Sequence, residues 1–477
     1  LAPCFFPGGA VQYPHALHEG GFSVVRDRSF YRTMLTIALP SAFQGLVSLL
    51  VVLVDNMMVA TLGDTVYAGV AQSNGATAFF VATITGLVGG SSVLISQYWG
   101  KRDMERIHRV FAIVAMTCVG AAAVFVAVIS FFPEWVLRLL VNDPGVIEAA
   151  LPYFTVVCWS YLPYALSAAL VGMLRSVEIV RVTLYATLLS LFSNITLNYL
   201  FIFGKLGFPA MGAQGAALAT VCARVLELLL VWQYMFRVQK RVAIRPRHLL
   251  RGDKALALDY ARYGLPVAIV DTQWAIVGFC KAAIIGRLGE RMIAANNIAE
   301  SLMQLGMIFT SSLAGGACVV IGKTVGAGAY QKAKEYARTI QLMFFLIGLV
   351  MASLVFALRA PFSGLYGGIS AEVRSLAMQM LALGAVTLIG TTYHASCFVG
   401  INRGAGDNRF VMAVDMICGW LVVLPAAYLA AFVWKLPLTW VFVMIRVDQL
   451  FKWVIAFLRL RGDKWIRNIT RDEGIKA

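Results

Sequence analysis

Charged residues are scarce in this chain of 477 residues: Asp, Glu, Lys and Arg together make up 13% of it. Soluble domains carry roughly twice that share, so the composition excludes a soluble globular protein. Hydrophobic residues make up 60% of the chain and gather in long runs that predict membrane-spanning helices. The sequence is therefore that of an integral membrane protein.

Several motifs that would indicate other functions are missing. The eight cysteines are scattered without a CxxC pattern, so they predict neither a disulfide framework nor a metal site. The Gly-containing segments at 97–102 and 322–327 follow predicted helices instead of strands, which excludes a phosphate-binding loop. The five histidines are spread over the chain, which argues against a membrane enzyme. We expect no catalytic residue and no cofactor.

Acidic residues are outnumbered by basic ones, 24 to 40, which gives a net charge of +16. A basic chain can bind nucleic acid, but most of these Lys and Arg residues lie in loops on one side of the predicted spans. That pattern orients a membrane protein with those loops in the cytoplasm. We therefore expect no nucleic-acid partner, a location in the plasma or inner membrane, and both termini in the cytoplasm.

The hydrophobic runs predict an all-α polytopic membrane protein with twelve transmembrane helices. The halves contain six spans each, so they are expected to be parallel repeats around a central cavity. The predicted spans are 34–61, 66–99, 110–131, 151–173, 183–203, 214–236, 264–286, 292–322, 339–358, 375–399, 411–434 and 438–458.

The spans divide the chain into two lobes with three connecting or terminal segments. We expect an uncertain N-terminal extension at 1–30, which has no signal-peptide pattern, and a first lobe at 31–236. A basic cytoplasmic linker at 237–262 leads to the second lobe at 263–460. Residues 461–477 are expected to form a cytoplasmic tail.

The segment at 39–100 is repeated, with many identical residues, at 265–326. Internal duplication in a polytopic membrane protein is typical of a transporter that rocks two halves about a central site. The copies align without a gap, and identical pairs include Pro40 and Pro266, Gly63 and Gly289, Gly90 and Gly316, and Gly100 and Gly326.

Asp55 is the strongest candidate for a functional residue in the first lobe. It lies roughly 12 Å below the outer end of its span, where a charge costs about 2.5–3.5 kcal/mol. Such an acid persists if it is protonated, binds a cation or faces a wet cavity. Asn194 and Asn198 share one helix face, and their oxygens, with Thr220 as a further ligand, would complete a Na⁺ site with Asp55. The alternative for the two amides is hydrogen bonding between helices.

The second lobe carries a base where the first carries an acid, because Lys281 aligns with Asp55. Lys281 and Glu300 flank a predicted hairpin turn at similar depth, so we expect them to form a buried ion pair or to share a proton. In a functional reading Lys281 repels cations and makes this lobe accept neutral or anionic cargo. A structural reading makes the pair a packing element.

Further intramembrane polar residues fall into two groups. Asp271 and the neighbours His394 and Tyr393 are candidates for a cavity or a proton relay, because histidine titrates near neutral pH; the alternative is packing. The remaining charges are expected to form local ion pairs between Asp448 and Lys452 and between Arg224 and Glu227, with Asp415 answering Arg403 or Arg409.

Five motifs in order give the chain a family resemblance. They are Val54-Asp55 followed by Ala60-Thr-Leu-Gly63, the segment Gly-Gly-Ser-Ser-Val-Leu-Ile-Ser-Gln-Tyr-Trp-Gly at 89–100, Asn194-Ile-Thr-Leu-Asn198, Gly212-Ala-Gln-Gly215 leading to Thr220, and Gly400 through Arg403-Gly-Ala-Gly-Asp407. Across residues 30–465 the chain resembles the multidrug and toxic compound extrusion (MATE) family.

The resemblance implies two six-helix lobes in a V around a cavity, and export of organic compounds in exchange for Na⁺ or protons. It also implies a functional acid at Asp55. Relatives often carry an acid at the position of Asn198, and its absence here disfavours Na⁺ in the first lobe and favours protons. Relatives often carry another acid at the position of Trp274, and its absence disfavours a second-lobe coupling site of the familiar kind, with Asp271 one turn earlier. The alternative is a flippase for lipid-linked or amphiphilic cargo of the same superfamily. We expect a monomer whose partners are the bilayer and a small-molecule cargo.

Overall fold

The computed structural model describes residues 25–141, 143–239, 242, 253–366 and 369–471. Within these ranges the chain is helical, without a strand. The first half contains α1 (Arg28–Ala60), α2 (Asp64–Lys101), α3 (Met104–Phe131), α4 (Pro133–Arg138), α5 (Pro144–Val157), α6 (Tyr161–Ser176), α7 (Arg181–Phe203) and α8 (Gly212–Gln233). The second half contains α9 (Lys254–Asp259), α10 (Leu265–Gly286), α11 (Glu290–Gly326), α12 (Tyr330–Gly364), α13 (Ala371–Ala395), α14 (Asn408–Met416), α15 (Leu424–Tyr428), α16 (Leu438–Met444) and α17 (Lys452–Arg461).

Eleven continuous helices in the described ranges are long and apolar enough to cross a membrane. They coincide with the first eleven predicted spans, several of them built from an α-helix and an adjoining 3₁₀ or π-helical segment. The twelfth predicted span is broken into α16, the 3₁₀ segment η8 (Val447–Leu450) and α17, because the backbone leaves the helical region at Arg446 (φ −121°) and Phe451 (φ −128°). The all-helical membrane fold is confirmed.

Two features of the chain near the predicted domain boundaries become visible in the structure. Residues 254–262, which the sequence assigned to the linker, are helical, because α9 continues through the π-helical segment η4 (Tyr260–Gly264) into α10. The start of α1 packs with the second half, since Phe30 and Met34 share a buried cluster with α11 and α12. The predicted extension lies outside the described residues up to position 24, and α1 begins at Arg28.

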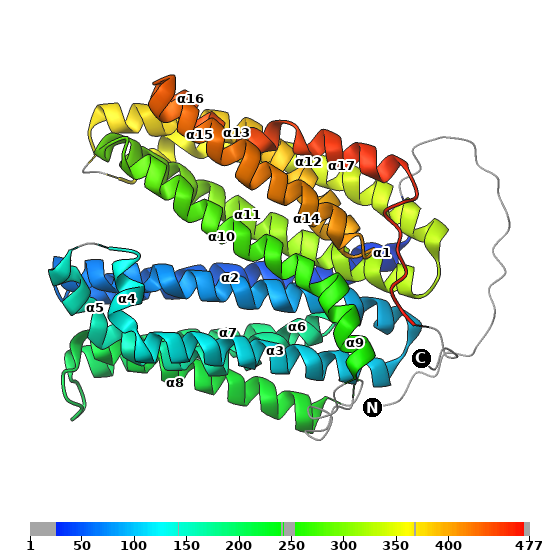
Figure 1. Cartoon of the computed structure of the whole chain (residues 1–477), viewed down its shortest axis with the longest axis horizontal. Coiled ribbons are helices and arrows are strands. Elements are labelled where there is room, and N and C mark those ends of the chain that lie inside the picture. The colour runs from blue at the N-terminus through cyan, green and yellow to red at the C-terminus, as the bar shows by residue number, and fades with distance from the viewer. Residues whose placement is uncertain (1–24, 142, 240–241, 243–252, 367–368, 472–477) are drawn as a thin grey trace.

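The two repeated segments form the interface between the halves. Helix α2 packs along α10 and α11, and α1 packs along α11, so the copies at 39–100 and 265–326 face each other. In Figure 1 the blue pair α1 and α2 lies directly against the green pair α10 and α11. Each half also has its own apolar core, one around Phe80, Phe154 and Leu170, the other around Met292 and Met380. Two lobes joined along the repeat follow from this packing.

Residues 462–471 run across both lobes at one end of the molecule, which we call the tail end (Figure 1). The Gln97 side chain of α2 accepts the Ile469 N–H at 2.9 Å and donates to the Arg467 carbonyl at 3.2 Å. Arg471 donates to both oxygens of Asp259 at 2.6 and 3.0 Å. Lys101 donates to the Arg471 carbonyl at 2.7 Å. The tail therefore joins the second lobe to α2 and to the residues before α10.

Candidate functional site

A cavity of about 610 Å³ lies inside the first lobe, among α1, α2, α5, α6, α7 and α8. This is the size of a site for a drug-sized molecule. Apolar residues such as Val51, Phe80 and Val81 line much of it. The polar and charged lining residues are Gln44, Ser48, Asp55, Asn74, Thr77, Thr85, Tyr153, Ser160, Tyr161, Tyr164, Arg175, Thr187, Ser190, Asn194, Thr220, Arg224 and Glu227.

Asp55, Asn194 and Thr220 line this cavity, and Asn198 lies between Asp55 and Asn194. Asn198 donates a hydrogen bond from Nδ2 to the Asp55 carboxylate, and the same Nδ2 lies 3.3 Å from Asn194 Oδ1. Asn194 in turn donates to Thr220 Oγ1 at 3.4 Å. Asn194 and Asn198 are buried because α7 packs closely on α8. The four residues singled out from the sequence thus form one hydrogen-bonded chain from α1 through α7 to α8.

The arrangement of this chain places an amide N–H₂ group, not an oxygen atom, next to Asp55. Hard cations are bound by oxygen atoms, whereas the group that lies between Asp55 and Asn194 is the N–H₂ group of Asn198, a hydrogen-bond donor. Asn198 Oδ1 is buried and has no hydrogen-bond partner among the described residues.

A second acid lines the cavity but is neutralised by its own helix. Glu227 accepts from Arg224 at 2.8 Å and from Ser167 at 3.4 Å. The Arg224 guanidinium also lies 5.0 Å from the centre of the Tyr164 ring, a cation–π distance. The predicted local pair of Arg224 and Glu227 is confirmed. Asp55 has no such ion pair among the described residues, so it is the lining carboxylate without a basic partner.

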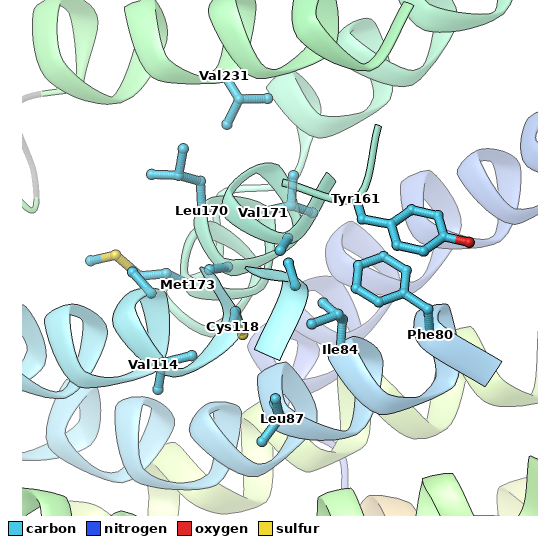
Figure 2. Close-up of a cluster of buried hydrophobic side chains, with 14 of the residues drawn as sticks. Phe80, Ile84, Leu87, Val114, Cys118, Tyr161, Leu170, Val171, Met173 and Val231 are labelled. Atoms are coloured by element: carbon cyan, nitrogen blue, oxygen red, sulfur yellow. The ribbon is translucent and has the colours of Figure 1, made fainter. Parts of the chain in front are cut away.

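Aromatic residues form one wall of the cavity. The rings of Phe80 and Tyr161 stack at 4.1 Å with an interplanar angle of 8°, and Figure 2 shows them side by side. The Tyr161 hydroxyl shares a hydrogen bond of 2.8 Å with Thr77, and the Tyr153 hydroxyl donates to Asn74 at 3.2 Å. Phe80 and Tyr161 are almost completely buried, so their stacking makes this side of the lining rigid.

The second lobe buries a lysine between two acids. Lys452 Nζ lies 2.7 Å from Asp415 Oδ1 and 3.0 Å from Asp448 Oδ2. All three side chains are buried, and the ammonium is 4.4 Å from the centre of the Trp274 ring. The predicted pair of Asp448 and Lys452 is confirmed, but the prediction that Asp415 answers Arg403 or Arg409 is wrong. Asp415 pairs with the Lys452 ammonium, and neither Arg403 nor Arg409 lies within ion-pair distance of it among the described contacts.

The predicted ion pair of Lys281 with Glu300 is wrong. Glu300 pairs with Arg446, which the break after α16 brings to α11. Lys281 instead lies 5.3 Å from the centre of the Trp274 ring and has no carboxylate oxygen within ion-pair distance in the described part of the chain. Two residues at equal depth in a helical hairpin need not be in contact, because their side chains can point toward other neighbours when the two helices diverge.

The remaining second-lobe candidates are held by local partners. Asp271 forms an ion pair of 2.8 Å with Arg403. His394 Nδ1 lies 3.1 Å from the carbonyl oxygen of Gly390 in its own helix, and the Tyr393 hydroxyl donates to Gln341 at 2.8 Å. These contacts do not link the two neighbours into one chain of hydrogen bonds.

Several residues that line the cavity were not predicted from the sequence. Gln44 and Arg175 lie at one part of it, where Arg175 donates to Gln44 Oε1 at 3.4 Å, and Tyr153 and Asn74 lie at another. Each of them is a polar residue in an apolar span, which was the only indication in the sequence. That indication cannot distinguish cavity residues from residues in ordinary helix contacts, because the way six helices pack decides which side chains line the cavity.

Comparison with protein families gives one match that covers more than half of the chain. The MatE family model matches twice, at residues 40–200 and at residues 266–429. The two matches begin at Pro40 and Pro266, the same point of the repeat. The internal duplication read from the sequence is thus a duplication of the family's own unit.

Known proteins of similar sequence are transporters. Multidrug resistance protein MdtK of Edwardsiella ictaluri (strain 93-146) is 26% identical over 413 residues, which cover 84% of this chain and 87% of that protein. The uncharacterized transporter YisQ of Bacillus subtilis (strain 168) is 23% identical over 423 residues, which cover 87% of this chain and 90% of YisQ.

Solved structures share the fold. A MOP superfamily transporter from Pyrococcus furiosus aligns with a TM-score of 0.81 at 19% identity, over 92% of this chain and 98% of that one. A multidrug resistance MATE family transporter in an outward-facing conformation aligns with a TM-score of 0.80 at 20% identity, over 92% and 98% of the two chains. With two copies of the family's unit, relatives along most of its length and this fold, the chain belongs to the MatE family of membrane transporters, which are not enzymes.

Proposed function

We propose that this protein is a secondary-active antiporter that exports organic, cationic and amphiphilic compounds in exchange for protons, with Asp55 as the coupling carboxylate. The single observation that carries the proposal is the position of Asp55, which lines a drug-sized cavity and has no ion-pair partner among the residues that the structure describes. A relative named multidrug resistance protein MdtK supports the export of drugs.

Exchange follows from competition for one carboxylate. When Asp55 is ionised, its negative charge attracts a cationic cargo into an apolar cavity, where electrostatic attraction is stronger than in water. When Asp55 takes a proton, that attraction is lost and the cargo is released. Asn198 keeps the carboxylate in place through its hydrogen bond. A proton on Asp55 weakens the binding of a cationic cargo, and a bound cationic cargo weakens the binding of the proton. Proton entry and cargo exit are therefore coupled.

The movement that exposes the cavity to each side is assigned to the two lobes. Each has its own apolar core, so each can move as a rigid body about the repeat interface. Most Lys and Arg residues lie in loops on one side of the spans, and we assign that side and both termini to the cytoplasm because basic loops remain there. Alternating access then means that the tail end opens when the other end closes. A monomer contains the whole of this site.

The second lobe has a supporting part in this proposal. Its buried acids Asp415 and Asp448 already have a cation, the Lys452 ammonium. Lys281 adds a positive charge near Trp274, which disfavours a second cation there. If Lys281→Met left transport and its pH dependence unchanged, Lys281 would be a packing residue and the part assigned to it here would be wrong.

Transport by purified protein in proteoliposomes tests the proposal. The vesicles are loaded with rhodamine 123, a cationic dye, and receive a pH jump or a Na⁺ jump in separate experiments. We expect dye movement driven by the pH gradient in the wild type and loss of that movement in Asp55→Asn. Movement driven by Na⁺ alone would contradict proton coupling and would require Asn198 to turn its oxygen toward Asp55.

A further inference from the structure

Within the described part of the chain, the lining of the first-lobe cavity has one base and one acid without an ion-pair partner. Of its charged lining residues, Arg224 and Glu227 neutralise each other at 2.8 Å. Asp55 and Arg175 remain. Arg175 has no carboxylate oxygen within 4.0 Å among the described residues, and the only side-chain hydrogen bond it makes there is to Gln44 Oε1, at 3.4 Å.

Arg175 is poorly satisfied for a partly buried guanidinium. Its Nε is buried and has no hydrogen-bond partner within the described ranges, although a guanidinium offers five donors in a planar fork. A charge at membrane depth is costly and normally pairs with another group or lines a water-filled path. The fork therefore has donors that no described residue uses, and a carboxylate is the group that matches its geometry.

Arg175 and Asp55 lie toward opposite ends of the cavity. Arg175 contacts Gln44, and both Gln44 and Asp55 are on α1. Eleven residues of helix separate them, which is roughly 16 Å along the axis. The α6–α7 connection after Arg175 is at the tail end, where Glu178 pairs with Lys323 at 2.5 Å. At this separation the two charges do not neutralise each other directly, so the cavity is positive toward the tail end and negative toward the other end.

We propose that Arg175 is an anion-binding residue of the cavity, and that the preferred cargo is a zwitterionic amphiphile whose carboxylate binds Arg175 and whose cationic group is directed toward Asp55. The half-buried apolar lining residues Val51, Val81 and Val88 receive the body of the molecule. This inference rests on the proposed function, because it names the substrate class of the same site.

A structural role would account for Arg175 in another way. It lies in the last turn of α6, where the partial negative charge of the helix end favours a cation. In that case its loss would weaken the protein or all cargo binding equally. An anion-binding role affects only cargo that carries an anion, so two dyes that differ in this group alone separate the alternatives.

Rhodamine 110 and rhodamine 123 are such a pair, since the second is the methyl ester of the first. We expect the wild type in proteoliposomes to bind and transport both and to prefer rhodamine 110. Arg175→Gln should raise the KM for rhodamine 110 by about tenfold or more, which corresponds to one lost charge-assisted hydrogen bond. The KM for rhodamine 123 should change less than about twofold, and the exposed Arg181→Gln should affect neither dye.

The outcomes separate this inference from the proposed function. If Arg175→Gln changed the KM of both dyes equally, or of neither, the anion-binding role would be wrong while cationic export stood. If the wild type moved neither dye, the proposed function would fail, and this inference with it. If Arg175→Gln bound neither dye, Arg175→Lys would decide: a retained preference for rhodamine 110 supports the role, and a lost preference with normal rhodamine 123 transport contradicts it.

Discussion

Gly100 and Gly326 make the same contact in opposite directions across the two lobes. A Cβ on Gly100 would lie 2.0 Å from the carbonyl oxygen of Lys323, and a Cβ on Gly326 would lie 1.9 Å from that of Gln97. The repeat aligns Gly100 with Gly326 and Gln97 with Lys323. A residue pair that exchanges roles in this way is the sign of a two-fold relation, so the pseudo-symmetry axis passes through this contact near the tail end.

Valine at either glycine should prevent the lobes from meeting at the tail end. The atoms in the way are backbone atoms, which cannot move aside as a side chain can, and overpacking of this kind costs about 1–3 kcal/mol. We expect Gly100→Val and Gly326→Val each to lower the midpoint of thermal unfolding in detergent and to slow transport. Gly315→Ala is the matched control from the same repeat, because a Cβ there has no atom within 4 Å; an equal effect in the control would contradict the account.

Asn198→Asp should change the ion that drives transport. The substitution replaces the N–H₂ group next to Asp55 and Asn194 with an oxygen, which makes the site one of oxygen ligands and adds a negative charge. We expect Na⁺-driven dye movement to appear in Asn198→Asp, and Asn198→Leu to lose pH-driven movement because Asp55 is no longer held. Transport by Asn198→Asp that stays independent of Na⁺ would contradict the assigned role of the amide.

Lys452→Met should destabilise the second lobe strongly. Removing the ammonium leaves Asp415 and Asp448 buried without their cation, and breaking a buried pair in this way costs about 3–5 kcal/mol. Adding Asp415→Asn and Asp448→Asn to the same protein should recover much of the loss. Arg138→Ala is the control: its pair with Glu134 is exposed, 70% and 59%, and should contribute about 0–1 kcal/mol. Thermal unfolding of the wild type, Lys452→Met, the triple variant and Arg138→Ala checks this order of stability.

Deleting the chain from residue 462 onward should loosen the tail end. The deletion removes the contacts of Gln97, Lys101 and Asp259 with the tail. Cys318 is buried next to Gly404 at this end, so in a protein with Cys318 as the single cysteine we expect maleimide labelling to become several-fold faster, because local opening exposes the thiol. Lys464→Ala, an exposed position in the same segment, should leave the rate unchanged; unchanged labelling after the deletion would show that the tail does not close this end.

The fold was predictable because its signals are local or repeated. Long apolar runs gave the helices, and the copy at 265–326 gave the two lobes. The first-lobe site was predictable in part, since Asp55, Asn194 and Asn198 are polar residues in apolar spans and the two amides share a face. Arg175 was not selected as a cavity residue, because its contact with Gln44 depends on how α6 packs against α1. The same limit explains Glu300: its partner Arg446 is reached only through the break in the twelfth span, which hydropathy does not reveal.

Proton release on cargo binding tests the central claim most directly. Rhodamine 123 is added to purified protein in a weakly buffered solution that contains a pH indicator, with Asp55→Asn as the comparison. If cargo and proton compete for Asp55, wild-type protein releases protons as it binds the dye, whereas Asp55→Asn binds the dye without releasing any or fails to bind it. Proton release that is the same in both proteins would contradict the account, because the exchanged proton would then be carried by another residue.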